Sequence, residues 1–268
     1  MKDNVLFKIN DFDLANSPSY HLYLKNTQDS YQYAVIDPAN HQVLLVGTHQ
    51  EPLVNTYNDI LEAKYGVVKI SLFTKSYTFI PEVHYSNTLE PTFTTFLQAD
   101  NLEIIQTEFL KYQEIRNIYA LNKIIFEKLQ EKFPIASFYS QVNPFFKNSL
   151  KINSSQTTQL FINFLNSHIE LLFLNNQDLL FYNIFEIKNN DELQYFILLA
   201  LQQLNLSSKN VHVNISGTID IDSTAWQKLS NLFAKVDLAK PENLNIPANL
   251  EQAPLHYYFS LLGLNLCE

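Results

Sequence analysis

The sequence predicts an α/β protein of two lobes, each built on a mixed sheet with a three-stranded antiparallel meander and flanking helices. Two observations lead to this class. Short apolar runs separated by Asn, Asp and Pro occur in both halves of the chain, which is typical of meander strands. In each half, a segment with helical spacing and a further strand then follow. Sheets that combine such strands with covering helices belong to the α/β class.

The first half opens with the predicted meander, whose strands are residues 21–24, 31–36 and 42–46. Apolar residues at helical spacing predict a helix over 52–65, with Gly66 at its C-cap position. A strand is predicted over 67–73. The middle of the chain predicts the following elements: a strand at 77–81, a short helix at 87–97, extended segments at 102–110 and 114–120, and a helix from Asn122 to 133.

The second half repeats the meander, with strands predicted at 160–165, 169–174 and 179–184. A helix is predicted over 190–204, because its apolar residues recur at i, i+3, i+4 and i+7. Tyr195 and Leu198 lie on its other face, so we expect this helix to be covered on more than one side. A strand at 211–215, a helix through 226–233 and a short strand at 236–238 complete the half.

The order of three meander strands, helix, strand, helix and strand therefore occurs twice. Used twice, this βββαβαβ unit is the plan of the ribonuclease-H-like folds, among them the actin-like ATPases. The polar stretch 141–158 is the expected transition between the halves. We predict a first lobe over residues 1–140 and a second over 141–268.

Residues 160–220 also resemble a family of uncharacterised bacterial proteins with an actin-like ATPase fold. The resemblance rests on Asn183-Ile184-Phe185 after the third strand, Asp191 with Tyr195-Phe196 at the start of the helix, Ser216-Gly217 after the next strand, and the ending Leu264-Asn265-Leu266-Cys267-Glu268. These motifs are structural in character. The resemblance therefore implies a fold rather than an activity.

The resemblance also implies where a nucleotide would bind. Actin-like ATPases use two hairpins of the Asp-x-Gly type and a glycine turn after a later strand, because glycine lets the backbone approach phosphates. Here the first hairpin, residues 25–30, has no glycine, and the second reads Asn166-Ser167-His168. Only Gly217, between Ser216 and Thr218, is retained. We expect the nucleotide site to be lost, with Ser216, Gly217 and Asp37 as vestigial candidates, and Gly217→Ala to be tolerated better than at a true nucleotide contact.

The low glycine content of the chain is compatible with hairpin turns but not with glycine-rich phosphate-binding loops. There are only 4 Gly among 268 residues, and Asn replaces glycine well in hairpin turns but not where a ligand must touch the backbone. The spacing of the glycines rules out both GxxxxGK[ST] and GxGxxG. No Gly-x-Ser-x-Gly elbow and no HExxH motif are present. The sequence predicts no catalytic residues and no cofactor.

No metal site is predicted either. We interpret His21, His168 and His212 as strand or turn residues, and the pairs Asp11/Asp13 and Asp220/Asp222 as turn and helix-cap residues rather than cation ligands. The single cysteine, Cys267, rules out a disulfide framework and a cysteine-based zinc site.

Charge and hydropathy indicate which classes of partner the protein is not expected to bind. The formal net charge is −9 and the only arginine is Arg116, so a nucleic-acid partner is not expected. No signal peptide and no apolar run of membrane-spanning length are visible, which predicts a cytoplasmic protein without a membrane span.

Two functions from different classes are consistent with these patterns. The first is a non-catalytic actin-like scaffold or adaptor, which binds another protein through the cleft between the halves or through an exposed sheet edge. The alternative is a divergent nucleotide-dependent phosphotransferase or ATPase, in which backbone amides of Asn-rich turns replace the glycine loops around ATP and Asp37, Asp178 or Asp220 holds Mg²⁺. The missing glycines favour the first. The identity of the partner and the oligomeric state cannot be read from the sequence.

Overall fold

The computed structural model describes residues 6–27, 30–50, 58–153, 157–250 and 253–268. The chain divides into two compact units. The first comprises residues 1–144, 244–252 and 267, and the second comprises 145–243, 253–266 and 268. The sequence-based lobe boundary between residues 140 and 141 stays a prediction.

The first unit is built on a six-stranded sheet in the order β1-β4-β3-β2-β5-β9. Its strands are β1 (Leu6–Lys8), β2 (His21–Asn26), β3 (Ser30–Asp37), β4 (Gln42–Gln50), β5 (Val67–Leu72) and β9 (Ser137–Ser140). Strands β2, β3 and β4 form the predicted antiparallel meander, while β5 lies parallel to β2 and β9 parallel to β5. Leu22, Leu24 and Val35 are completely buried in its core, so the short apolar runs that predicted these strands form part of the core.

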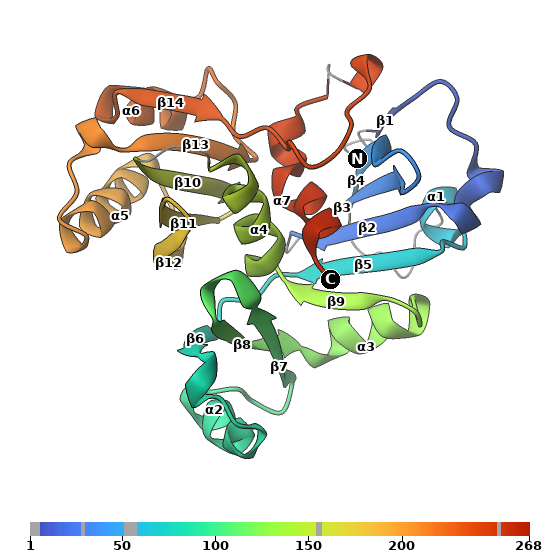
Figure 1. Ribbon diagram of the computed structural model, residues 1–268, viewed down its shortest axis with the longest axis horizontal. Coiled ribbons are helices and arrows are strands. Elements are labelled where there is room, and N and C mark those ends of the chain that lie inside the picture. The colour runs from blue at the N-terminus through green and yellow to red at the C-terminus, as the bar shows by residue number, and fades with distance from the viewer. Residues whose placement is uncertain (1–5, 28–29, 51–57, 154–156, 251–252) are drawn as a thin grey trace. The chain divides into compact units, whose positions relative to one another are not determined.

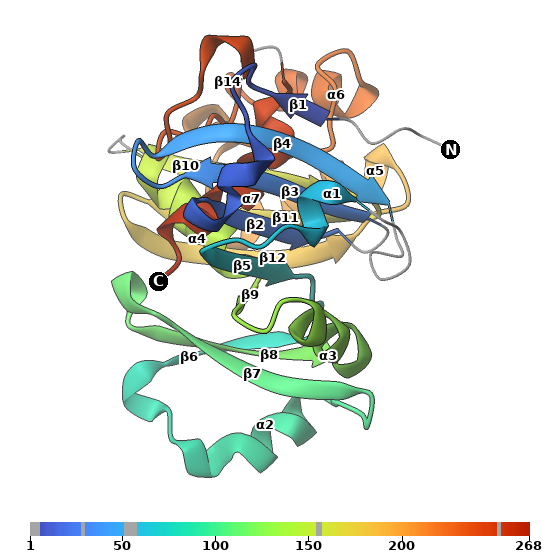
Figure 2. The same ribbon diagram turned by 90° about the vertical axis from the view of Figure 1, so that its right-hand side faces the viewer.

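A smaller sheet is inserted between β5 and the helix that leads to β9. It has the order β6-β8-β7 and comprises β6 (Tyr77–Pro81), β7 (Glu103–Leu110) and β8 (Ile115–Asn122). Figure 2 shows this sheet between β9 and helix α2 (Glu90–Phe96). Helix α3 (Lys123–Lys132) begins directly after β8, where the side chain of Asn122 accepts a hydrogen bond from Ile125 N–H at 3.0 Å. The elements predicted for this region are confirmed.

The helix predicted over 52–65 is wrong in its length. Among the described residues, helix α1 covers only Asp59–Glu62 and is capped by Asn58, while residues 51–57 lie outside the described part. Gly66 is not a helix cap, because the helix already ends at Ala63 in extended backbone. A Cβ at Gly66 would lie 2.7 Å from the Pro18 carbonyl oxygen, so glycine is needed there for close packing of two backbone segments.

The second unit is built on a five-stranded sheet in the order β12-β11-β10-β13-β14 (Figure 1). The strands are β10 (Thr158–Leu165), β11 (His168–Asn175), β12 (Asp178–Glu186), β13 (His212–Gly217) and β14 (Lys235–Leu238). The first three form an antiparallel meander, and β13 and β14 extend it in parallel. This order matches β4-β3-β2-β5-β9 of the first unit strand for strand. The predicted internal repeat is therefore confirmed.

Two helices bury one face of this sheet. Helices α5 (Asn190–Gln203) and α6 (Thr224–Leu232) pack on Leu160, Ile162 and Ile215, which are completely buried. Asn189 caps α5 and Ser223 caps α6 through side-chain oxygens. The expectation that α5 is covered on more than one side is wrong: Tyr195 is 60% exposed and Leu198 is 44% exposed.

The stretch 141–158, predicted as the polar transition between the halves, contains helix α4 (Val142–Ile152). Several polar residues of this helix are buried: Asn143, Asn148 and Ser149. Asn148, for example, is completely buried and donates to the Phe259 carbonyl at 2.8 Å. Phe259 begins α7 (Phe259–Leu262) in the apolar end of the chain.

A late segment of the chain completes the first unit. Asn245 N–H donates to the His41 carbonyl at 2.7 Å, and Val43 N–H donates to the Asn245 carbonyl at 3.0 Å. The Asn245 side chain also donates to the Asn40 carbonyl at 2.5 Å. Residues around 245 therefore lie beside the turn between β3 and β4.

No helix in the described part of the chain is long and apolar enough to cross a membrane.

Candidate functional site

The first hairpin expected to contact a nucleotide is the turn between β2 and β3. Its own side chains close it: the N–H and the hydroxyl of Thr27 both donate to the Ser30 carbonyl at 2.9 Å. The hydroxyls of Thr27 and Ser30 are 2.6 Å apart. Residues 28 and 29 of the predicted turn lie outside the described part. What is described of this turn is held by hydroxyl groups, and the sequence supplies no glycine to it.

The second hairpin joins β10 to β11 through Asn166 and Ser167. His168 follows, and its buried imidazole places Nδ1 3.0 Å from Ser167 Oγ and Nε2 4.0 Å from a Glu186 carboxylate oxygen. Each position of the turn thus carries a polar side chain. A phosphate cannot approach such a backbone as closely as it approaches a glycine turn.

The third element is Gly217, at the end of β13. Its φ is +84°, and a Cβ built there would lie 2.0 Å from the Phe164 carbonyl oxygen. Next to it, Thr218 N–H donates to the same carbonyl at 3.0 Å. Glycine is therefore required by the neighbouring strand of the protein itself. Gly217→Ala is therefore expected to cost stability, because the space that a methyl group needs is filled by backbone. That it is tolerated better than at a true nucleotide contact stays a prediction.

The vestigial candidates and the carboxylates of the alternative hypothesis have local roles. Asp37 accepts from Ala39 N–H at 2.9 Å and from the Asn40 side chain at 3.0 Å, which makes it a turn residue. Asp220 accepts from the Tyr257 hydroxyl at 2.6 Å. Asp178 opens β12 opposite Asn175. No group of three or more His, Cys, Asp or Glu in the described chain is arranged to hold a metal ion.

Ser216 belongs to a buried polar cluster that the sequence analysis missed. Its hydroxyl donates to Asn163 Oδ1 at 3.0 Å, and the Asn163 amide donates to Glu170 Oε2 at 2.5 Å. The Tyr182 hydroxyl donates to the other oxygen of Glu170 at 2.6 Å. Glu170 is completely buried. Ser216 is thus a structural member of the sheet rather than a free phosphate contact.

A second buried carboxylate, Glu108, lies in the first unit. It accepts hydrogen bonds from the Tyr119 hydroxyl at 2.7 Å, from Ser140 N–H, and from the Ser140 hydroxyl at 3.2 Å. Asn117 donates to that hydroxyl at 2.9 Å. Burial raises the pKa of Glu108 to about 7, although the hydrogen bonds act in the opposite direction. This carboxyl group joins β7, β8 and the end of β9.

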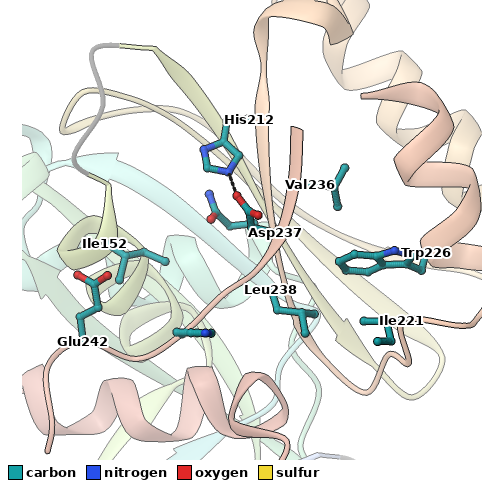
Figure 3. Close-up of a pocket in the computed structure, with 10 residues that line it drawn as sticks. Ile152, His212, Ile221, Trp226, Val236, Asp237, Leu238 and Glu242 are labelled. Atoms are coloured by element: carbon teal, nitrogen blue, oxygen red, sulfur yellow. Dashed lines mark hydrogen bonds and ion pairs between the residues drawn. The ribbon is translucent and has the colours of Figure 1, made fainter. Parts of the chain in front are cut away.

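A pocket of about 560 Å³ lies along β14 in the second unit (Figure 3). Figure 3 shows Trp226 and Val236 on one side of the strand and His212 and Asp237 on the other. His212 Nε2 is 2.7 Å from Asp237 Oδ2. The lining contains no Ser, Thr or Cys that this pair could activate as a nucleophile. As predicted, His212 is a strand residue.

The comparisons with known proteins agree with the fold. Residues 9–236 match the family model described as Protein of unknown function (DUF3822). The chain belongs to this family. Among curated proteins, nothing matches.

Two solved structures show which fold this DUF3822 chain adopts. One is a Bacteroides thetaiotaomicron VPI-5482 protein described as having an actin-like ATPase fold and unknown function. It is 20% identical, with a TM-score of 0.79 over 96% of this chain and 99% of that one. The other is from the PilM–PilN type IV pilus biogenesis complex, 11% identical, with a TM-score of 0.65 over 92% and 97% of the two chains. The fold is that of the actin-like ATPases, as the repeated strand order predicted.

Proposed function

We propose that this DUF3822 chain is a non-catalytic, actin-like scaffold or adaptor that binds another protein, and that its nucleotide site is degenerate. Gly217 is the observation that carries the proposal. It is the single glycine left among the three turn elements, and the Phe164 backbone occupies the space beside it. A glycine retained by internal packing gives no support for a phosphate contact. As part of the same proposal, the protein acts in the bacterial cytoplasm, through lobes bounded near residue 140.

Two further observations support a protein partner. Large apolar side chains are exposed in both units, among them Tyr112 in the first, at 71%, and Tyr195 in the second, at 60%. Exposed aromatic side chains are common where proteins associate. In addition, the similar PilM chain is part of a complex with PilN, so this architecture is compatible with a protein-binding role.

Titration with a non-hydrolysable ATP analogue and Mg²⁺ tests the degenerate site. We expect no binding heat when the protein is titrated calorimetrically, because no glycine-lined turn or cluster of metal ligands is available among the described residues. Micromolar affinity would contradict the proposal and favour the phosphotransferase or ATPase alternative. Substitution of Asp37, Asp178 and Asp220 by Asn would then show which carboxylate holds the metal ion.

Nucleic acid is not the expected partner. At physiological salt we expect no binding of labelled DNA or RNA at low micromolar protein, because a net charge of −9 repels phosphates. The single arginine also has other contacts: Arg116 forms two hydrogen bonds with the Glu82 carboxylate and lies 4.1 Å from the centre of the Tyr85 ring. An electrophoretic shift that weakens with added salt would contradict this prediction.

A further inference from the structure

Strand β14 is an edge strand with unused backbone groups. It pairs only with β13, in parallel. Just beyond the strand, Ala239 N–H donates to the Ile215 carbonyl of β13 at 2.8 Å. Backbone groups alternate in direction along a strand, so those of Asp237 also point towards β13, whereas those of Val236 and Leu238 point away from the sheet. No described residue pairs with these outward groups.

The pocket along β14 supplies different chemistry on the two faces of the sheet. On one face, Trp226, Val236 and Ile221 offer apolar surface, and Ile221 is 55% exposed. On the other face lie Asp237 and, beyond the strand, Glu242 (Figure 3). Side chains of an added strand also alternate between the two faces. A segment bound here would therefore meet apolar surface with every second residue and a polar, charged surface that includes Glu242 with the residues between.

On the second face, Glu242 is the carboxylate available to a basic occupant, because Asp237 already has basic neighbours. Asp237 has His212 at 2.7 Å and Lys235 at 3.6 Å. Glu242 is exposed and forms no ion pair with a described residue, although Lys240 also lines the pocket. The net charge of −9 further favours association with a basic segment.

Resting on the proposed protein-binding function, we propose that β14 is the docking site, and that its occupant is an extended segment of the partner protein with alternating apolar and Lys or Arg residues. The segment adds a strand to the sheet by pairing with Val236 and Leu238. Its apolar side chains contact Trp226, and its basic side chains face Glu242. Backbone pairing supplies the affinity and the two pocket faces supply the selectivity.

The other edge of the same sheet is less open to such pairing. In β12, the N–H of Ile184 already receives a hydrogen-bond partner, the Asn183 side-chain oxygen at 2.8 Å. At the β14 edge, the outward backbone groups lie beside the flanking pocket. The four residues of β14 and its charged Lys235 and Asp237 limit indiscriminate strand pairing, so a specific sequence is required.

The test uses phage-displayed random nine-residue peptides selected on the full chain. We expect the selected sequences to alternate apolar with Lys or Arg residues. Leu238→Pro should weaken binding of the synthesised peptides by about tenfold or more, because proline removes the outward N–H. Leu238→Ala is the matched control: it shortens the same side chain, keeps the N–H, and should weaken binding far less. Glu242→Lys should weaken binding of the basic peptides several-fold.

Hydrogen exchange keeps the test valid if Leu238→Pro fails to fold. In the parent protein, a bound peptide should slow the exchange of the Val236 and Leu238 amides but leave that of Asp237, which already faces β13, unchanged. Failure to select any peptide, equal affinity for the proline and alanine variants, or no protection in β14 would overturn the docking site. A partner that still binds Leu238→Pro would leave the scaffold proposal intact, whereas micromolar ATP-analogue binding would contradict the scaffold proposal itself.

Discussion

Replacing Gly217 by alanine is expected to lower the free energy of unfolding by on the order of 4 kcal/mol, combining left-handed backbone strain with a steric clash. The backbone contribution comes from the φ of +84°. The steric contribution comes from the Phe164 carbonyl oxygen, 2.0 Å from the position that the new Cβ would take. Since backbone cannot move aside as a flexible side chain can, β10 and β13 must separate locally. Chemical denaturation of the parent and the variant measures the difference.

Asn205→Ala is the matched control for the backbone contribution. Asn205 has a φ of +54° after helix α5 and is exposed, so alanine there should cost only about 1 kcal/mol from the left-handed conformation. The difference between the two variants therefore reports the clash with Phe164. Equal losses of stability in both would show that the turn at Gly217 relaxes. It would also reopen the space beside Gly217 to a ligand.

The second large effect concerns Glu108 and pH. Its pKa rises from 4.5 in the unfolded chain to about 7 in the folded protein, so the folded state retains a proton that the unfolded state has lost. The stability contributed by this group is complete below pH 4.5 and decreases as the pH rises through 7. Between pH 4.5 and about 7, the free energy of unfolding therefore decreases by about 3 kcal/mol.

Glu108→Gln should remove this pH dependence. Glutamine stays neutral, and its amide oxygen can still accept from Tyr119 and Ser140 N–H, so the variant should be more stable than the parent above pH 7.5. The measurement is urea denaturation of both proteins at several values between pH 5 and 8.5. Glu127→Gln, which removes the negative charge of a side chain that is 59% exposed, should follow the parent. A parent-to-variant difference that is constant with pH would refute the assignment to Glu108.

Much of the fold could be predicted because turns and short apolar strands are determined by residues that are neighbours in the sequence. Asn166-Ser167 and the apolar runs around it fix β10 and β11, and the same signals fix β2 and β3. The order of predicted strands and helices then indicated an internal repeat, and this repeat indicated the actin-like ATPase fold. The loss of glycine from the hairpins was also visible, because it depends on residue type alone.

What the sequence did not reveal depends on contacts between distant residues. Glu108 and Ser140 are brought together by the end of β9 meeting the inserted sheet, and no local pattern signals a carboxyl group with a pKa near 7. Gly66 was predicted as a helix cap and Gly217 as a vestigial nucleotide contact, because the backbone segments that crowd them come from elsewhere in the chain. The polar residues within apolar strands, Asn163 and Glu170, were the available signal for the second buried cluster.

The hydrogen bonds of Asn245 have a consequence for how the molecule is made. Asn245 joins the turn between β3 and β4 across a separation of 205 residues. During translation, the meander of the first unit leaves the ribosome long before Asn245 is synthesised. Until then, the N–H of Val43 is hydrogen-bonded to water instead of to the Asn245 carbonyl. Closing so long a loop is slow, because its entropy cost precedes any gain from the contact. The first unit is translated first, but it can complete its hydrogen bonds only after residue 245 has been synthesised. In a nascent chain stalled before residue 244, the N–H of Val43 in β4 lacks this acceptor.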